Sequence, residues 1–333
     1  MRRMAKIISA VLYITSFILI FSGCKKTENP IKFPKGTFPD SVLNISGINS
    51  VYDDFNMDIY VLSATTPLVF SSNRGSSGGQ FDLVHGTLSY VFCQETGDFV
   101  LNGEMTNDVF LDKLVSAANT TGDDFGPCRL YSPLDGYEYL IVSSVNTDGN
   151  LDLFYIKNLP YFGTKLPEIN GPYPVRLFNS GSDDAYICFD TNQDSAYFSS
   201  NRDGDFDIFL HKRPAETNLD SWFDADYSSP FRADSINSTG EDKCPFIYGR
   251  IMVFASDRPE GTGGYDLYYS VFRNGKWSSP VNFGPDINTP SDEYRPVLGS
   301  HDDFTNLFMI FSSNRHGGKG GFDLYFTGVE FSN

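Results

Sequence analysis

Pairs of acidic residues recur along this chain, and carboxylates are the side chains whose number and spacing could support chemistry. Each pair begins four residues after an asparagine that is followed by serine or threonine. The five pairs are Asp53-Asp54, Asp123-Asp124, Asp183-Asp184, Glu241-Asp242 and Asp292-Glu293. Clustered carboxylates can bind Ca²⁺, which takes about six to eight oxygen ligands, and two acids that flank a glycosidic bond can hydrolyse it.

Calcium is the one cofactor that the acids suggest. If the units are arranged radially, the acids would form a ring near one end of a central channel. The weak calcium candidates are Asp54, Asp124, Asp184, Asp242 and Glu293. The chain contains no compact calcium loop of the EF-hand type. The alternative is that one acid of each pair caps a turn or meets an arginine while the other is solvated.

Other catalytic arrangements have little support. The histidines, His85, His211, His301 and His316, stand in no motif with serine or cysteine, and there is no Gly-x-Ser-x-Gly sequence. Cys93, Cys128, Cys188 and Cys244 lack zinc spacing; they would allow two disulfides, whose pairing cannot be read from sequence. Because the acids repeat equally, they behave as structural residues. We therefore expect no catalytic residues and no enzymatic activity.

The acids belong to a repeated unit that must position them. The opening asparagines stand at positions 49, 119, 179, 237 and 288, so successive units are 51 to 70 residues apart. Each unit continues with an apolar run ending in Ser-Ser-Asn-Arg or a variant, a Gly-rich turn, and a segment such as Phe81-Asp82-Leu83. Aromatic and β-branched runs bounded by Gly, Asn and Asp indicate strands. Four such strands per stacked unit predict an all-β propeller.

The repeat also resembles a known family. Phe198-Ser199-Ser200-Asn201-Arg202 and Phe322-Asp323-Leu324-Tyr325 look like parts of PD40 repeats, the WD40-like units of the TolB propeller and of many bacterial exported proteins. The resemblance covers about residues 41 to 333. It implies a propeller, but it does not imply one role, because proteins with these repeats have varied functions.

We predict five four-stranded blades, with six as the alternative. The last repeat stops after its third strand, whereas residues 41–48 align with segments that supply an outer strand elsewhere. The N-terminal strand would therefore complete blade five, which removes an exposed sheet edge.

Recurring arginines and aspartates predict ion pairs within the repeat, because the guanidinium fork matches a carboxylate. Arg74 with Asp82, Arg258 with Asp266, and Arg315 with Asp323 are eight residues apart, and Arg202 with Asp207 is five apart. The second repeat carries Asp152 but has Asn146 in place of the arginine. A structural role is the favoured interpretation.

Two aromatic insertions break the repeat, at residues 158–174 and 211–227. Loops on rigid scaffolds often carry function, and aromatic rings provide contact area for proteins and sugars. The candidate partner-binding residues are Tyr161, Phe162, Tyr173, Trp222, Phe223 and Tyr227. The alternative is that these residues cover the edge of a blade.

The N-terminus predicts export and lipidation. Arg2, Arg3 and Lys6 precede about 15 apolar residues, fewer than the roughly 20 needed to span a bilayer, so residues 1–23 are expected to be a signal peptide. Small residues before Cys24 resemble a bacterial lipobox, which implies a lipidated cysteine. Residues 24–40 would be a tether and 41–333 the folded domain.

Net charge excludes one class of partner. The chain carries −17 at pH 7, and removing residues 1–23 with their three basic residues lowers this to −20. An acidic surface repels phosphate backbones, so no nucleic acid is expected to bind.

These observations predict an outer-membrane lipoprotein, facing the periplasm or the cell surface, with membrane contact through its lipid anchor alone. We expect a non-catalytic scaffold for a protein partner in the cell envelope. The alternatives are a surface glycan-binding protein and a five-bladed glycoside hydrolase.

Overall fold

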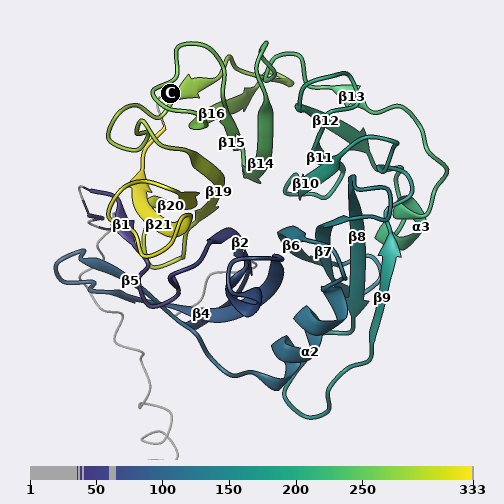
Figure 1. Cartoon of the computed structure of the whole chain (residues 1–333), viewed down its shortest axis with the longest axis horizontal. Helices are drawn as coiled ribbons and strands as arrows, with labels where there is room; N and C mark the ends of the chain where they lie inside the picture. The colour runs from purple at the N-terminus through teal and green to yellow at the C-terminus, as the bar shows by residue number, and fades with distance from the viewer. Residues whose placement is uncertain (1–35, 37, 40, 60–64, 332–333) are drawn as a thin grey trace, which may run out of the picture.

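Five antiparallel sheets surround a central channel in the computed structural model, which describes residues 36, 38–39, 41–59 and 65–331 (Figure 1). The first strands of neighbouring blades contact one another around the ring. The strands of blade 1 are β2 (Asp54–Ile59), β3 (Thr65–Ser72), β4 (Asp82–Phe92) and β5 (Phe99–Glu104), and those of blade 2 are β6 (Asp124–Ser132), β7 (Tyr137–Val145), β8 (Leu151–Asn158) and β9 (Ile169–Pro174). Blade 3 contains β10 (Asp184–Phe189), β11 (Ser195–Ser200), β12 (Asp207–Lys212) and β13 (Phe231–Arg232). Blade 4 contains β14 (Asp242–Tyr248), β15 (Ile251–Ser256), β16 (Asp266–Arg273), β17 (Lys276–Trp277) and β18 (Val281–Asn282), and blade 5 contains β19 (Glu293–Gly299), β20 (Leu307–Ser313), β21 (Asp323–Val329) and β1 (Leu43–Asn44).

The predicted five-bladed propeller is confirmed, including its closure by the N-terminal strand. Leu43 pairs with Phe326 and Asn44 with Tyr325, so β1 forms the fourth strand of blade 5. The hairpin joining β16 to β17 turns at Asn274 and Gly275, whose φ angles of 52° and 80° suit the type I′ turn that this dipeptide favours. The prediction of Cys24 lipidation and most of the tether lie outside the described residues.

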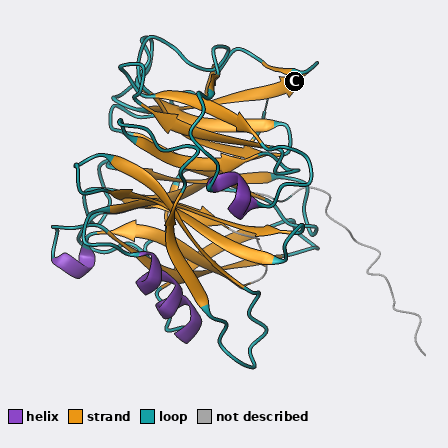
Figure 2. Cartoon of the chain, turned by 90° about the vertical axis from the view of Figure 1, so that its right-hand side faces the viewer, coloured by secondary structure: helices purple, strands orange, loops and turns teal. Residues whose placement is uncertain are grey.

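Besides the short 3₁₀ helix Arg74–Ser76, two α-helices interrupt the β structure of the described residues, and the strand pattern predicted neither of them (Figure 2). Helix α2 (Val109–Ala118) follows β5 and starts where the Asp108 side chain accepts hydrogen bonds from two backbone N–H groups. Its apolar side packs between blades 1 and 2. Helix α3 (Leu219–Phe223) lies in the second aromatic insertion. No helix within the described part of the chain is long and apolar enough to cross a membrane.

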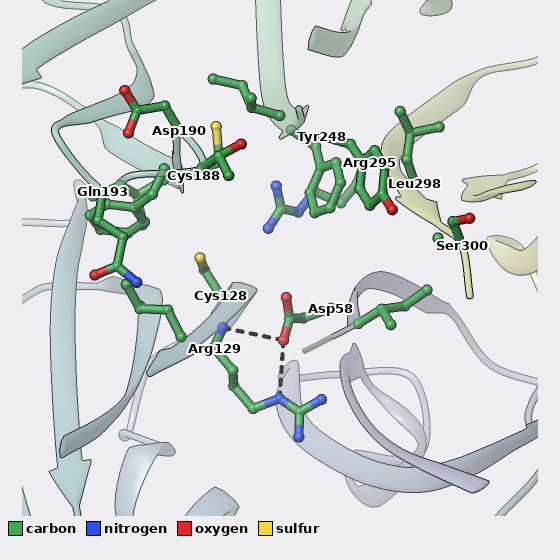
Figure 3. Close-up of a pocket in the computed structure, with 18 of the residues that line it drawn as sticks. Asp58, Cys128, Arg129, Cys188, Asp190, Gln193, Tyr248, Arg295, Leu298 and Ser300 are labelled. Carbon is green, nitrogen blue, oxygen red and sulfur yellow. Dashed lines mark hydrogen bonds and ion pairs between the residues drawn. The ribbon is translucent and has the colours of Figure 1, made fainter. Parts of the chain in front are cut away.

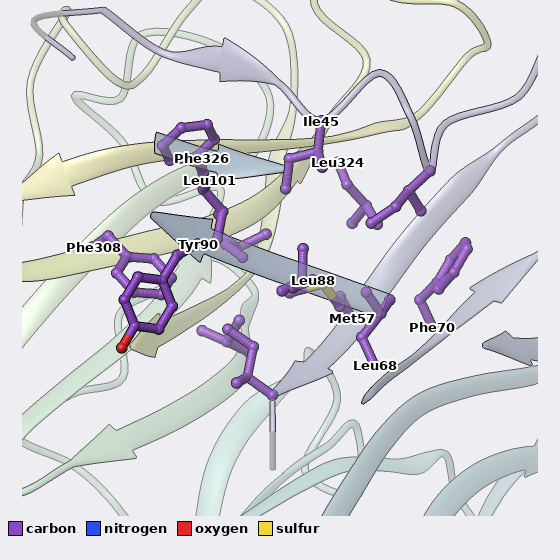
Figure 4. Packing of buried hydrophobic residues seen from close by; sticks show 14 of the residues in the cluster. Ile45, Met57, Leu68, Phe70, Leu88, Tyr90, Leu101, Phe308, Leu324 and Phe326 are labelled. Carbon is purple, nitrogen blue, oxygen red and sulfur yellow. The ribbon is translucent and has the colours of Figure 1, made fainter. Parts of the chain in front are cut away.

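Apolar side chains fill the junctions between blades. Figure 4 shows the junction of blades 1 and 5, where Leu68 and Leu88 of blade 1 meet Phe308 and Phe326 of blade 5 in one buried cluster. Burying one such side chain contributes about 1.5–3 kcal/mol. The ring closure is therefore held by a continuous core as well as by strand pairing.

The opening asparagine of each unit fastens the loop before a first strand to the third strand of the preceding blade. In the closing junction, the Asn49 Nδ2 donates to the Leu324 carbonyl and the Asn49 Oδ1 accepts from the Leu324 N–H, both at 2.9 Å. We call this pair of bonds the asparagine clasp. The same clasp joins Asn119 to Leu83, Asn179 to Leu153, Asn237 to Ile208, and Asn288 to Leu267.

The first acid of the pair strengthens the same junction in four of the five units. The Asp53 Oδ1 accepts the Phe322 N–H at 2.7 Å, and the next backbone N–H, that of Asp54, donates to the Phe322 carbonyl at 2.8 Å. Asp123, Asp183 and Asp292 accept the corresponding N–H groups. The acidic pair is thus part of a joint between blades.

The clasp gives a first testable prediction. Asn49→Ala should lower the free energy of unfolding by about 1–3 kcal/mol, because it leaves the buried Leu324 N–H without a partner, whereas the Leu324 carbonyl keeps its hydrogen bond from the Ile45 N–H. Urea unfolding measures the change. Asn107→Ala, at an exposed asparagine, is the matched control and should change stability by less than about 0.5 kcal/mol. Equal losses in the two variants would contradict the role of the clasp.

Candidate active site

Each of the five first strands contains a β-bulge at the same position, two residues after the second acid of its pair. The residue there has a positive φ, between 47° and 59°. The five bulge residues are Asn56, Gly126, Tyr186, Cys244 and Arg295. A bulge bends a strand and redirects its side chains. These five residues, unlike the acids, differ in every blade.

The redirected strands end at a cavity of about 510 Å³ at one mouth of the channel (Figure 3). Residues from all five blades line it. They include Asp58 of blade 1, Arg129 of blade 2, Asp190 of blade 3, Tyr248 of blade 4 and Arg295 of blade 5. Its volume lies within the range of about 300–1,000 Å³ that is usual for ligand sites.

Asp58 is the buried carboxylate of this cavity, with 4 % of the residue exposed. Its Oδ2 accepts hydrogen bonds from the Arg129 backbone N–H at 3.2 Å and from Arg129 Nε at 3.0 Å. Its other oxygen faces the cavity (Figure 3). Burial raises the pKa of Asp58 above its ordinary value, although the Arg129 guanidinium acts in the opposite direction. Asp58 is therefore suited to hold a proton at the cavity wall.

Arg295 is a buried cation on the cavity floor, with 2 % of the residue exposed. Its Nη2 donates to the Pro127 carbonyl of blade 2 at 3.0 Å, and its Nη1 donates to the Pro245 carbonyl of blade 4 at 3.4 Å. Its Nε has no hydrogen-bond partner. Within the described part of the chain, no carboxylate forms an ion pair with it.

Two thiols also line the cavity. Burial raises the pKa of Cys188 to about 12 and raises the pKa of Cys128 as well. Both thiols therefore stay protonated near neutral pH, and they are poor nucleophiles and poor metal ligands. None of the four described cysteines forms a disulfide.

Carboxylates on opposite rims complete the lining. The Asp190 Oδ1 accepts the Asp194 N–H at 2.8 Å within the turn between β10 and β11, which anchors the side chain. Asp302 is exposed in the loop between β19 and β20. The cavity thus combines the buried carboxyl group of Asp58 with the half-buried one of Asp190 and the exposed one of Asp302.

A second cavity of about 500 Å³ shares Asp190, Thr191 and Ile247 with the first. It runs outward between blades 3 and 4, where Phe272 and Trp277 contribute aromatic rings. The two cavities are therefore neighbours, and the second lies farther from the channel than the first.

The acids that the sequence suggested as calcium ligands lie within the blades. Asp54 accepts a hydrogen bond from Ser72 at 2.5 Å and one from Arg74 Nη2 at 2.5 Å. Asp124, Asp184, Asp242 and Glu293 occupy the same place in their own blades. No group of three or more metal-binding side chains is present among the described residues.

The arginines pair with these second acids and not with the aspartates that follow them. Arg202 pairs with Asp184, Arg258 Nη2 lies 2.5 Å from Asp242, and Arg315 Nη2 lies 3.0 Å from Glu293. The predicted pairs were wrong because they were chosen by spacing along the chain. The second acid of each unit lies on the neighbouring strand, opposite the serine that stands two residues before the arginine, as Asp242 faces Ser256. The predicted arginine partners instead bind other groups: Asp82 binds Gln80, Asp207 binds Arg232, Asp266 binds the Thr262 and Gly263 N–H groups, and Asp323 binds the Lys319 and Gly320 N–H groups.

Blade 2 has no arginine at this place. The Asp124 carboxylate accepts from Ser144 and Thr120, and burial raises its pKa. Asn146, which replaces the arginine, donates to Asp152 at 2.8 Å.

The aromatic candidates divide into two groups. Trp222 and Phe223 are buried in α3 against blades 2 and 3, so they are not accessible to a partner. The four exposed residues are Tyr161, Phe162, Tyr173 and Tyr227. These four do not line the channel cavity.

Sequence reasoning missed Asp58, Arg129, Asp190 and Arg295. One of them, Asp58, could have been found as a departure from the repeat. When the five units are aligned on the second acid, the residue four positions later is Asp58, Cys128, Cys188, Phe246 or Val297. Asp58 is the one acid in that set. Positions that differ among otherwise equal units are where a single constellation can form.

Comparisons with known proteins support the fold. No protein-family model matches the chain, and no curated protein sequence matches it. A thermostable family-43 glycoside hydrolase superposes with a TM-score of 0.54 at 14 % identity, covering 87 % of this chain and 93 % of the other. An endo-arabinase from Bacteroides thetaiotaomicron (12 % identity) and an α-L-arabinofuranosidase from Podospora anserina (11 % identity) each give a TM-score of 0.53, covering 88 % of this chain and 98 % of theirs.

These findings correct two predictions. The resemblance to PD40 and TolB repeats is wrong as a family assignment, because no family model matches and the similar structures are five-bladed glycoside hydrolases. The prediction of a non-catalytic scaffold for an envelope partner is overturned by the same similar structures, which favour the glycoside hydrolase alternative. At these identities the likeness itself establishes the fold.

The buried pairs between arginine and acid give a second testable prediction. Arg258→Met should lower the free energy of unfolding by about 3 kcal/mol at pH 7, because the Asp242 carboxylate stays fully buried without its cation. Arg176→Met removes an exposed arginine that pairs with Asp224, and should cost less than about 1 kcal/mol. Chemical denaturation of both variants measures the difference, and a similar small loss in both would refute the structural role.

Proposed function

We propose that this protein is a glycoside hydrolase whose active site is the cavity at the channel mouth. The observation that carries the proposal is Asp58, a single buried carboxyl group whose free oxygen faces a cavity that all five blades build. The fold supports it, because glycoside hydrolases use the same five-bladed scaffold. Hydrolysis of a glycosidic bond needs two carboxyl groups in unequal environments, and this cavity provides them.

In the proposed reaction Asp58 is the general acid. Its proton passes to the glycosidic oxygen as the bond from that oxygen to the anomeric carbon breaks. A rim carboxylate, Asp190 or Asp302, takes a proton from the water whose oxygen joins the anomeric carbon. The Arg129 contacts hold Asp58 in place and leave its second oxygen free to reach the substrate.

The substrate is proposed to be a polysaccharide. The second cavity, between blades 3 and 4, adjoins the first and places the exposed ring of Phe272 where a sugar ring could stack. The similar structures include an endo-arabinase and an arabinofuranosidase, so arabinan and arabinose-substituted polymers are the first compounds to assay.

The role of Asp58 gives the third testable prediction. Asp58→Asn should lower kcat on a polysaccharide by at least about 100-fold and should spare an aryl glycoside with a good leaving group, because such a bond breaks without a general acid. Since the acid must be protonated and burial raises its pKa, wild-type activity should fall as pH rises through that raised pKa. Turnover measured against pH on both substrates tests this.

Variants of the rim acids provide the comparison. Asp190→Asn or Asp302→Asn, whichever removes the base, should lower kcat on both substrates. Phe162→Ala, at an exposed residue outside the cavity, should leave both activities unchanged. No turnover on any polysaccharide or aryl glycoside, or equal losses on both substrates in Asp58→Asn, would contradict the proposed mechanism.

Lipidation at Cys24 and an outer-membrane location remain proposals, supported by the basic, apolar and small residues that precede this cysteine. Labelling with a palmitate analogue in a bacterial host should mark the wild type and should not mark Cys24→Ser. Membrane fractionation of both forms gives the location. Equal labelling of the two forms would refute the anchor.

A further inference from the structure

We infer that the cavity recognises a sugar that bears a carboxylate, a uronic acid, through the Arg295 guanidinium. The inference rests on the proposed function, which makes this cavity a sugar site. It adds the chemical class of the residue bound there, which the similar glycoside hydrolases do not indicate.

The first argument is the unbalanced charge of Arg295. A buried cation is normally paired with a carboxylate, because removing it from water is costly. The four arginines of the blade repeat follow this rule, each with its own acid. Arg295 is more deeply buried, with 2 % exposed. It donates hydrogen bonds to the carbonyls of Pro127 and Pro245, and its guanidinium carbon lies 5.9 Å from the centroid of the Tyr186 ring, so it contacts an aromatic ring but forms no ion pair with a carboxylate of the described residues.

The second argument is the direction in which the Arg295 guanidinium points. Figure 3 shows the guanidinium of Arg295 pointing into the cavity, toward the side on which Cys128 and Cys188 lie. Its Nε is buried and without a partner, so the group retains donors for a ligand. The planar fork of arginine matches a carboxylate and binds it with charge-assisted hydrogen bonds.

The third argument is the charge balance of the inner cavity. Arg129 and Arg295 supply two positive charges, and Asp58 supplies at most one negative charge. The rim acids, the half-buried Asp190 and the exposed Asp302, belong to loops at the edge of the cavity. A carboxylate bound on Arg295 would bring the inner cavity close to neutrality, while the sugar ring extends toward the rim.

The arrangement also fits the proposed chemistry. Arg295 acts through its charge to lower the pKa of Asp58. A bound carboxylate would offset that influence and raise the pKa of Asp58 further, which favours the protonated form that a general acid needs. Binding of a uronate substrate would thus increase the fraction of Asp58 that is protonated and ready to act as the general acid.

Calorimetry at pH 7 tests the inference with methyl glycosides of D-galacturonic and D-glucuronic acid, their methyl esters, and the neutral D-galactose and D-glucose counterparts. The wild type should bind at least one uronate about 10- to 100-fold more tightly than its ester and its neutral counterpart, because both lack the charge. Arg295→Met should lose this preference. Lys165→Met, which removes an exposed cation outside the cavity, should keep it.

Each other outcome is informative. Equal binding of uronate, ester and neutral sugar by the wild type would overturn the inference, and turnover of neutral polysaccharides would then leave the proposed function standing. Uronate binding that depends on Arg295 without turnover of any glycan would support the carboxylate site and refute the hydrolase. Preference for a 6-sulfated galactoside over the uronate would replace the carboxylate with a sulfate. If Arg295→Met does not fold, the comparison of acid with ester on the wild type decides.

Discussion

The asparagine clasp is the constraint on which the rest of the molecule depends. The strands of one blade can pair with each other, but the ring forms only if each blade is also joined to the next one. This requires that the first strand of a blade is held at a fixed position along the third strand of the preceding blade. In each unit one carboxamide satisfies both backbone groups of a residue in the preceding third strand, as Asn49 does for Leu324. Because the donors and acceptors are buried, leaving them unpaired is costly, so the loop has one favourable position. The junction of blades 5 and 1 uses the same hydrogen bonds as the junctions between the other blades. The closure of the ring between the N-terminal and C-terminal parts of the chain therefore uses the same asparagine contact as the other four junctions.

This joint separates structure from chemistry along each first strand. The acids at the start of the strand serve the junction between blades in four of the five units and the ion pair or hydrogen bonds within the blade in all five, and both positions are acidic in every unit. The bulge that follows redirects the strand. In three of the five units the N–H of the bulge residue donates to a serine of the preceding blade, as Tyr186 donates to Ser143 at 3.0 Å. Beyond the bulge the side chains have no structural role that is common to all five units, so the residue type can differ between blades. The residues at the equivalent position are Asp58, Cys128, Cys188, Phe246 and Val297. The opposite ends of the channel thus carry a uniform structural ring and a varied ligand cavity.

The same separation explains what could be read from the sequence. Five blades and the closing strand follow from motifs that recur in register, because each recurrence reports the same local geometry. The site does not recur, and Asp58 resembles any other acid until the bulge places it on the channel. The arginine partners were wrong because the sequence orders residues along a hairpin, whereas Arg258 meets Asp242 across the sheet. Trp222 and Phe223 interrupt the repeat as a binding loop would, yet α3 turns them into the core, which composition cannot distinguish.

Charge in the cavity opposes the charge of the whole protein, and this contrast bears on how it would select a ligand. The chain carries −17, so its long-range field repels anions and would slow the approach of an acidic polymer. Such repulsion is screened over about 8–10 Å in physiological salt, whereas the contacts of Arg295 are buried and escape most of that screening. Affinity for a carboxylate would then come from the floor of the cavity and not from the surface. Because Arg295 and Asp58 influence each other, binding of an anion and protonation of Asp58 must be linked: whichever occurs first favours the other by the same factor. A neutral sugar would gain nothing from this coupling, and the site would therefore distinguish charged from neutral substrates both in binding and in readiness for proton transfer.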